Sequence, residues 1–139
     1  MTRINVIPVE ELSDQHLIAE YRELPRALKW NGLDISNAPD KYCLGAGHIK
    51  WARKHWRSTL KRYTGLIQEM LYRGFNVSYT MTGLISYCIS IPVTIKDSWY
   101  NVSESDIELN RERIKERYLM KPNWYRWTKR VKPDYLKGI

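Results

Sequence analysis

Long hydrophobic runs are missing from this sequence of 139 residues. No stretch is long enough to span a membrane, and none resembles the apolar core of a signal peptide, so we expect a cytoplasmic protein without a membrane partner. Cysteine is also scarce. Cys43 and Cys88 lie far apart and lack the spacing of a metal site, which favours free thiols in a reducing compartment.

Metal-ligand patterns and repeats are absent as well. His48 and His55 are seven residues apart, and no acidic residue completes a known ligand pattern with them. We therefore expect neither a metal nor an organic cofactor. The chain has no internal repeat, and its length predicts one domain over residues 1–139, which we expect to be a monomer.

Phenylalanine is nearly absent, with one residue against six tryptophans and ten tyrosines. Aromatic rings with a polar atom suit interfaces and base stacking as well as cores. Lysine and arginine number 23 against 15 acidic residues, and residues 41–75 and 111–139 each carry a net charge of +7. These two basic blocks would form a cationic face if they folded side by side. Solvated helix surface is the alternative, but the interleaved aromatics favour nucleic acid as the partner.

The hydrophobic periodicity predicts three main helices. The first covers residues 9–23, and Pro25 should kink or end it just after a charged cluster. The second covers residues 49–73 and ends at Gly74. Its apolar positions should face the core; they are Ile49, Ala52, Trp56, Leu60, Tyr63, Ile67 and Met70. Basic residues occupy its other side; they are Lys50, Arg53, Lys54, Arg57 and Lys61.

The third predicted helix covers residues 104–120, where Ser103 and Asp106 have the spacing of a capping box. Residues 29–43 read as a loop. Residues 86–95 have a strand-like composition, but Pro92 argues against a central strand, so we expect residues 76–102 to be irregular. As a nucleotide-binding signal, the motif Gly45-Ala46-Gly47-His48 is weak. A tight turn that leads into the second helix is the better interpretation.

The N-terminus carries the clearest chemical signal. Removal of Met1 is expected because Thr2 is small, and it would leave a free amine on Thr2. An α-amine has a pKa of about 7.7–8.0 against about 10.4 for lysine, so much more of it is nucleophilic near neutral pH. Glu23 lies between Arg22 and Arg26, which should keep its carboxylate ionised. An amine nucleophile and a carboxylate are the minimum set of functional groups for Schiff-base chemistry on a sugar.

Several segments resemble one known family, and they occur in the same order over most of the chain. They are Thr2-Arg3-Ile4-Asn5, Asp14-Gln15-His16-Leu17, Ala19-Glu20-Tyr21-Arg22-Glu23-Leu24-Pro25-Arg26, Leu44-Gly45-Ala46-Gly47-His48, Arg73-Gly74-Phe75-Asn76 and Lys121-Pro122-Asn123-Trp124-Tyr125. The family is that of the pyrimidine-dimer DNA glycosylases with abasic-site lyase activity, of the phage endonuclease V type. The resemblance implies an all-α domain with long ordered loops and a basic aromatic C-terminal tail, located in the host cytoplasm if the source is a virus.

The resemblance also implies site residues. The Thr2 amine would attack C1′ of the damaged nucleotide, and Glu23 would be the catalytic carboxylate. The bound partner would be lesion-containing duplex DNA, kinked and with a base flipped out. The supporting and DNA-binding residues would be Arg3, Gln15, His16, Arg22, Arg26, Arg113, Arg117 and Lys121.

Two alternatives stay open on sequence grounds. Residues 29–43 are shorter and more acidic than the corresponding connection in better-known members, with Asp34 and Asp40 present. The substrate could then be another modified or damaged base, or abasic sites only. In the second alternative the chain is a non-catalytic module that recognises bent duplex DNA, which a retained Met1 would favour.

Overall fold

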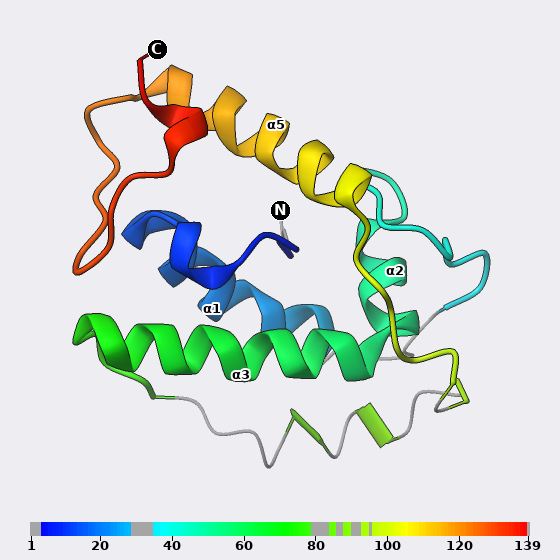
Figure 1. Cartoon of the computed structure of the whole chain (residues 1–139). Coiled ribbons are helices and arrows are strands. Elements are labelled where there is room, and N and C mark those ends of the chain that lie inside the picture. The colour runs from blue at the N-terminus through cyan, green and yellow to red at the C-terminus, as the bar shows by residue number, and fades with distance from the viewer. Residues whose placement is uncertain are drawn as a thin grey trace.

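The structure is a computed structural model, and it describes residues 4–28, 35–78, 84–85, 88–89, 93–94 and 96–138. Its regular elements are all helical, so the predicted all-α fold class is confirmed for this part of the chain. The order is η1 (Val9–Glu11), α1 (Asp14–Leu28), α2 (His48–Lys54), α3 (Trp56–Arg73), α5 (Glu104–Met120) and η2 (Asp134–Leu136). In Figure 1, α1 lies behind the space between α3 and α5, and the chain enters through the middle of this arrangement.

Helix α1 begins later and ends later than the sequence predicts. A short 3-10 turn, η1, precedes it, and α1 continues through Pro25 to Leu28, so the proline does not end the helix. Proline lacks an N–H group and disfavours a helix interior. Here Leu24 and Leu28 on either side of it are fully buried, and this burial of apolar surface stabilises the last turn.

The second predicted helix is two helices. His55 separates α2 from α3 with φ −100° and ψ 47°, and in Figure 1 α2 runs across the direction of α3. The His55 ring explains the break. Its Nδ1 and Nε2 lie 2.9 and 3.1 Å from the carbonyl oxygens of Asp97 and Asp40, which belong to distant loops. Gly74 ends α3 in the left-handed conformation with φ 86°, as predicted.

Helix α5 has the predicted bounds and the predicted cap. The Ser103 hydroxyl accepts the Asp106 N–H at 3.2 Å, and the Asp106 carboxylate accepts the Ser103 N–H at 3.0 Å. Before it, Leu84 and Cys88 are buried helical residues, so the irregular segment expected over residues 76–102 contains helical turns. Most of residues 86–95 lie outside the described residues.

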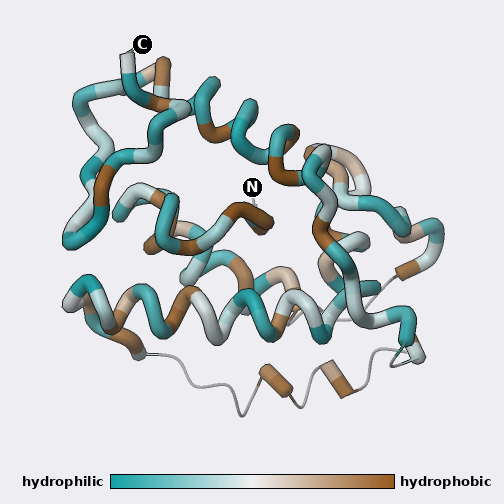
Figure 2. The backbone as a smooth tube through the Cα atoms, viewed as in Figure 1, coloured by the Kyte–Doolittle hydropathy of each residue, from teal (hydrophilic) through white to brown (hydrophobic). Residues whose placement is uncertain are grey.

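The core forms between α1, α2 and α3 and extends to the inner side of α5. Figure 2 shows hydrophobic and hydrophilic residues alternating along these helices. The largest fully buried apolar side chains are Ile4, Ile7, Leu12, Leu17, Leu24, Leu28, Tyr63, Leu66, Leu84 and Leu136. Within the described residues, no helix is long and apolar enough to cross a membrane.

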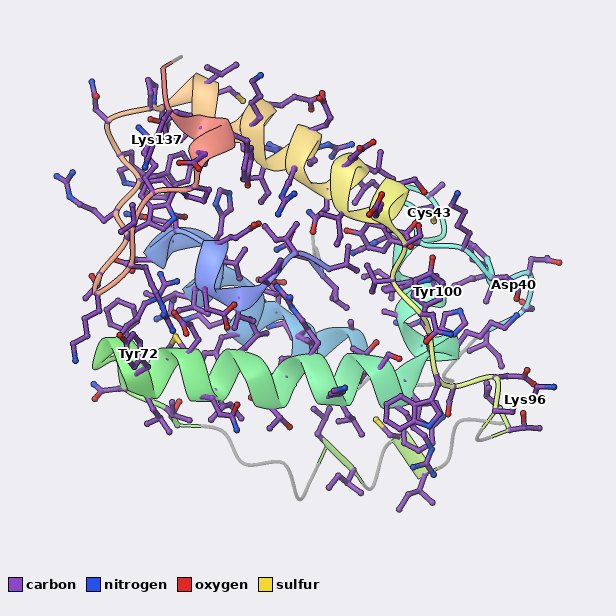
Figure 3. The ribbon with its side chains drawn as sticks, in the orientation of Figure 1. Asp40, Cys43, Tyr72, Lys96, Tyr100 and Lys137 are labelled. Carbon is purple, nitrogen blue, oxygen red and sulfur yellow. The ribbon has the colours of Figure 1, made fainter. Side chains whose placement is uncertain are left out.

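A buried ionic cluster joins the C-terminal segment to α3. Glu69 accepts hydrogen bonds from Arg73 at 2.8 Å and from two nitrogens of Arg130, both at 2.8 Å. Arg73 also donates to Asp14 at 2.9 Å, and Asp14 accepts the Thr128 N–H at 3.0 Å. These charges are paired with good geometry, as buried charges must be. Tyr72, at the end of α3 in Figure 3, lies beneath the Arg130 guanidinium at 4.2 Å from its ring centre.

This cluster should make the protein sensitive to acid. Burial alone raises the pKa of Glu69, but the hydrogen bonds from Arg130 and Arg73 outweigh it and lower the pKa below its ordinary value of 4.5. The unfolded state then binds the proton more readily, so this stabilisation is present above pH 4.5 and is lost as the pH falls below it. We expect Glu69→Gln to cost about 3 kcal/mol at neutral pH and to flatten the acid limb.

Urea unfolding measured between neutral and acidic pH checks this prediction. Glu112→Gln, which removes an exposed glutamate from α5, is the control and should keep the wild-type slope. An acid limb as steep in Glu69→Gln as in the wild type would contradict the role of this carboxylate.

Candidate active site

The N-terminal segment is held by side chains rather than by a sheet. Residues 4–7 cross the centre of the molecule without belonging to a helix or strand. The Ile4 N–H donates to Nε2 of His48 at 2.7 Å, and the Tyr42 hydroxyl donates to the Ile4 carbonyl at 2.9 Å. Both polar groups of this buried residue are therefore bonded, one to α2 and one to the loop before it.

Tyr100 stabilises the position of Tyr42, which bonds the Ile4 carbonyl. Its hydroxyl accepts the Tyr42 N–H at 2.8 Å and donates to Asp106 at 2.7 Å, which connects the loop before α2 with the start of α5. Figure 3 places Tyr100 beside α2, on the loop segment that leads into α5. Burial, followed by the Asp106 carboxylate, raises the pKa of Tyr100 to about 12, against the opposing effect of the Tyr42 N–H. The hydroxyl therefore remains protonated and can donate at any physiological pH.

Asn110 of α5 holds the other end of the segment. Its Oδ1 accepts the N–H groups of Val6 and Ile7 at 2.7 and 3.2 Å, and its amide nitrogen donates to the Asn5 side chain at 2.7 Å. Asn5 in turn donates to Glu20 of α1 at 2.8 Å. The segment is thus fixed between α5 on one side and α1 on the other.

Arg62 of α3 completes this network. It donates to both Glu20 oxygens, at 2.7 and 3.0 Å, and it also bonds the Ile7 carbonyl. Glu20 is 2 % exposed and Asn110 is fully buried, so every polar group here depends on these partners. A fully satisfied buried network of this kind fixes one arrangement of the chain.

Glu23 lies one turn beyond Glu20 on α1, and residues three apart in a helix share a face. Ile4 is bonded to α2, and α2 reaches the end of α1 through Arg53, whose Nε donates to the Ala27 carbonyl at 2.9 Å. The described segment therefore runs antiparallel to α1 (Figure 1). Glu23 is one-third exposed. Thr2 and Arg3 lie outside the described residues.

The two arginines that flank Glu23 have different surroundings. Arg26 is exposed and places Nη1 at 3.4 Å from the Glu23 carboxylate. Arg22 is also exposed and lines a cavity of about 440 Å³ together with Tyr21 and Asn76. The structure thus pairs Arg26 with Glu23 and directs Arg22 toward the segment after α3. Both guanidiniums remain accessible to an anion.

Gln15 and His16 make contacts within the protein. The Gln15 side-chain amide donates to the Trp124 carbonyl at 2.8 Å and accepts the Arg126 N–H at 3.0 Å, so it bonds the backbone of the C-terminal tail at two positions. The His16 ring stacks on Tyr125 at 4.8 Å between centres and lies 2.9 Å from the Ser13 hydroxyl. These two residues hold the C-terminal tail against the start of α1, a role that the sequence does not indicate.

Several cations of the second basic block stay on the surface. Arg117, Lys121 and Arg126 are exposed, and the Lys121 ammonium lies 5.5 Å from the ring centre of Trp124, which is 54 % exposed. We call these four residues the tail surface. Arg113 is less available, because its Nε lies 3.4 Å from Glu116 and its side chain is 28 % exposed. Cations beside an exposed indole suit a nucleic-acid strand.

The first basic block is largely used inside the protein. Arg53, Arg62 and Arg73 bond to α1 and to the N-terminal segment, and Arg53 is buried although the sequence places it on the outer side of its helix. Lys54 pairs with Asp40 of the preceding loop. The first block therefore contributes only part of its positive charge to the surface. A count of charges cannot tell an arginine that binds carbonyls in the core from one that faces solvent.

The turn before α2 was correctly predicted. The sequence did not predict that His48 would accept a hydrogen bond from the N-terminal segment. Gly45 and Gly47 have φ values of 74° and 86°, and His48 begins α2 directly after them. A Cβ on Gly47 would lie 2.9 Å from Cγ of Pro39, so this position excludes other residues both by conformation and by space. Among the described residues, no three histidine, cysteine or acidic side chains are grouped so that they could hold a metal ion.

A sequence model of the family described as pyrimidine dimer DNA glycosylase matches residues 1–82. The matched region contains the N-terminal segment, α1, α2 and α3, and with them Glu20, Glu23, His48 and Arg62. The match covers more than half of the chain, and it includes residues 4–7 next to the N-terminus. The protein therefore belongs to the pyrimidine dimer DNA glycosylase family.

Proposed function

We propose that this DNA repair glycosylase removes ultraviolet-induced pyrimidine dimers from duplex DNA and cleaves the resulting abasic site with its own N-terminal amine. One observation carries the proposal. Residues 4–7 are fixed antiparallel to α1, with Asn5 bonded to Glu20, and Glu23 follows one turn later on α1. Thr2 lies two residues before Ile4, a span of about 7 Å of extended chain, and the proposal is that this span brings its amine to the Glu23 carboxylate.

In the proposed reaction the unprotonated Thr2 amine forms a bond to C1′ of the damaged nucleotide, and the glycosidic bond breaks. The base leaves with the bonding electron pair and takes up a proton. Opening of the sugar ring gives an imine between the amine and C1′. Loss of a proton from C2′ then expels the 3′ phosphate, and water later releases the amine. Glu23 stabilises the positive charge on the sugar and moves protons in these steps.

Binding of the duplex is assigned to two groups of cations. Arg3, Arg22 and Arg26 would hold phosphates near the lesion, because a guanidinium matches two phosphate oxygens. Arg117, Lys121 and Arg126 of the tail surface would contact the strand further away, with Trp124 available for stacking. Neutralised phosphates release counterions, so binding should weaken steeply with salt.

A panel of duplexes tests this function. Each carries one cyclobutane dimer, one abasic site, another modified base or no lesion, and each is incubated with protein whose intact mass shows that Met1 is absent. We expect cleavage of one glycosidic bond and of the strand in the dimer duplex, with the detached base still joined to its neighbour through the cyclobutane ring, cleavage of the abasic duplex, and a covalent adduct with both after borohydride reduction.

Other outcomes would overturn parts of the proposal. Cleavage of the abasic duplex alone, or of the modified-base duplex in preference to the dimer, would contradict the assigned lesion. Tight binding of kinked duplex without base release, cleavage or adduct would contradict enzymatic activity and favour a non-catalytic module.

A further inference from the structure

We propose that His48 is a positioning residue for the N-terminal amine. It accepts the Ile4 N–H and so sets the direction in which the chain continues to Thr2. This inference rests on the proposed lyase function. The contact is the one nearest to the N-terminus among the hydrogen bonds of the described segment, with 2.7 Å between the Ile4 nitrogen and Nε2 of His48.

The hydrogen bonds of His48 define its protonation state. A backbone nitrogen can only donate, so Nε2 must carry the lone pair. Nδ1 lies 2.8 Å from the Cys43 carbonyl, which can only accept, so Nδ1 must carry the proton. The ring is therefore a neutral imidazole in one tautomer, with the Cys43 carbonyl selecting the tautomer that Ile4 needs.

The ring has little freedom to turn. His48 is 4 % exposed, stacks on Trp51 at 6.1 Å between centres, and meets the edge of Tyr42 at 5.8 Å. Tyr42 in turn bonds the Ile4 carbonyl, so the two rings hold both backbone polar groups of the same residue. The left-handed Gly47, with no space for a Cβ, fixes the backbone directly before the histidine.

The effect on chemistry follows from distance. Ile4 lies two residues from Thr2, or about 7 Å of extended chain. Without the hydrogen bond between Ile4 and His48, the N-terminal residues could adopt other orientations. A misplacement of about 1 Å in a reacting group costs roughly 10²-fold in rate. A residue that acts in this way changes the rate of covalent attack without changing the affinity for DNA.

Two substitutions separate this role from simple stabilisation. His48→Gln can place an amide oxygen near the position of Nε2 and keep the acceptor for Ile4. His48→Asn can still donate to the Cys43 carbonyl but is too short to reach Ile4. The matched control is His55→Asn, since His55 is similarly buried and bonded to two carbonyls but has no described hydrogen bond to residues 4–7.

The main readout is single-turnover borohydride trapping on an abasic duplex. It is measured well below the melting temperature of each variant, together with the dissociation constant for an uncleavable abasic analogue. We expect His48→Asn to slow trapping by roughly 10²-fold with affinity within about twofold, and His48→Gln to recover most of that rate. His55→Asn should melt earlier yet trap at the wild-type rate.

Amide exchange at Ile4 gives a readout independent of activity. The Ile4 amide should be protected in the wild type and in His48→Gln and exchange faster in His48→Asn. If the wild type traps no DNA, the lyase proposal fails while this exchange result still stands. Wild-type trapping by His48→Asn would overturn the positioning role, as would equal losses in both His48 variants. If these variants do not fold, Tyr42→Phe, which releases the Ile4 carbonyl, should slow trapping in the same way, and an unchanged rate would overturn the proposal.

Discussion

Protein that retains Met1 should lose at least roughly 10²-fold in borohydride trapping on an abasic duplex compared with protein that begins at Thr2. With Met1 attached, the Thr2 nitrogen is part of a planar amide and cannot form an imine. The Met1 amine that replaces it is displaced by one residue, about 3.5 Å along the chain. A Thr2→Leu variant provides this state, because methionine removal requires a small second residue, and intact mass verifies it.

The control for this experiment is Thr2→Ser, which keeps both the removal of Met1 and the free amine. It should trap at close to the wild-type rate. Both variants should bind the uncleavable duplex equally, because neither changes a cation of the DNA-binding groups. Equal trapping by Thr2→Ser and by unprocessed Thr2→Leu would rule out the N-terminal amine as the nucleophile.

Replacing Glu23 with glutamine should reduce strand cleavage by about 10²–10⁴-fold, the range that a positioned acid or base contributes. The side chain keeps its size, and its ion pair with Arg26 is partly exposed. Stability should therefore change little, since such pairs contribute about 0–1 kcal/mol. Duplex affinity should be kept or slightly increased, because one negative charge near the DNA is removed.

Glu112→Gln is the matched control for this change. It removes the same charge from an exposed position on α5, outside the described contacts of the N-terminal segment. It should share any general increase in DNA affinity and retain full cleavage. Full cleavage by Glu23→Gln as well would refute the catalytic role of this carboxylate, whereas a loss of DNA binding would indicate a structural role instead.

Local features of the fold were readable from the sequence because they depend on neighbouring residues. The capping box of Ser103 and Asp106 acts over three positions, and Gly74 needs only its own backbone conformation to end α3. The turn through Gly45 and Gly47 is of the same kind. Where distant partners intervene, prediction fails. The break at His55 depends on carbonyls of Asp40 and Asp97, which the hydrophobic pattern cannot reveal.

The candidate site was only partly readable for the same reason. The sequence singled out Thr2 and Glu23, and it included Asn5 and His48 in the family segments without giving them a task. Their task depends on contacts over long separations, 44 positions between Ile4 and His48 and 105 between Asn5 and Asn110. No periodicity or short motif carries such information.

The sequence by itself determined the helical fold class, the local caps and turns, and a candidate nucleophile and carboxylate that resemble those of one enzyme family. The tertiary structure alone decided which charges remain available for DNA. It buries Arg53, Arg62 and Arg73 against carbonyls and carboxylates, while Arg117 and Lys121 stay exposed. It also decided the course of the N-terminal segment, because a chain outside helices and sheets takes its direction from side chains contributed by the rest of the fold.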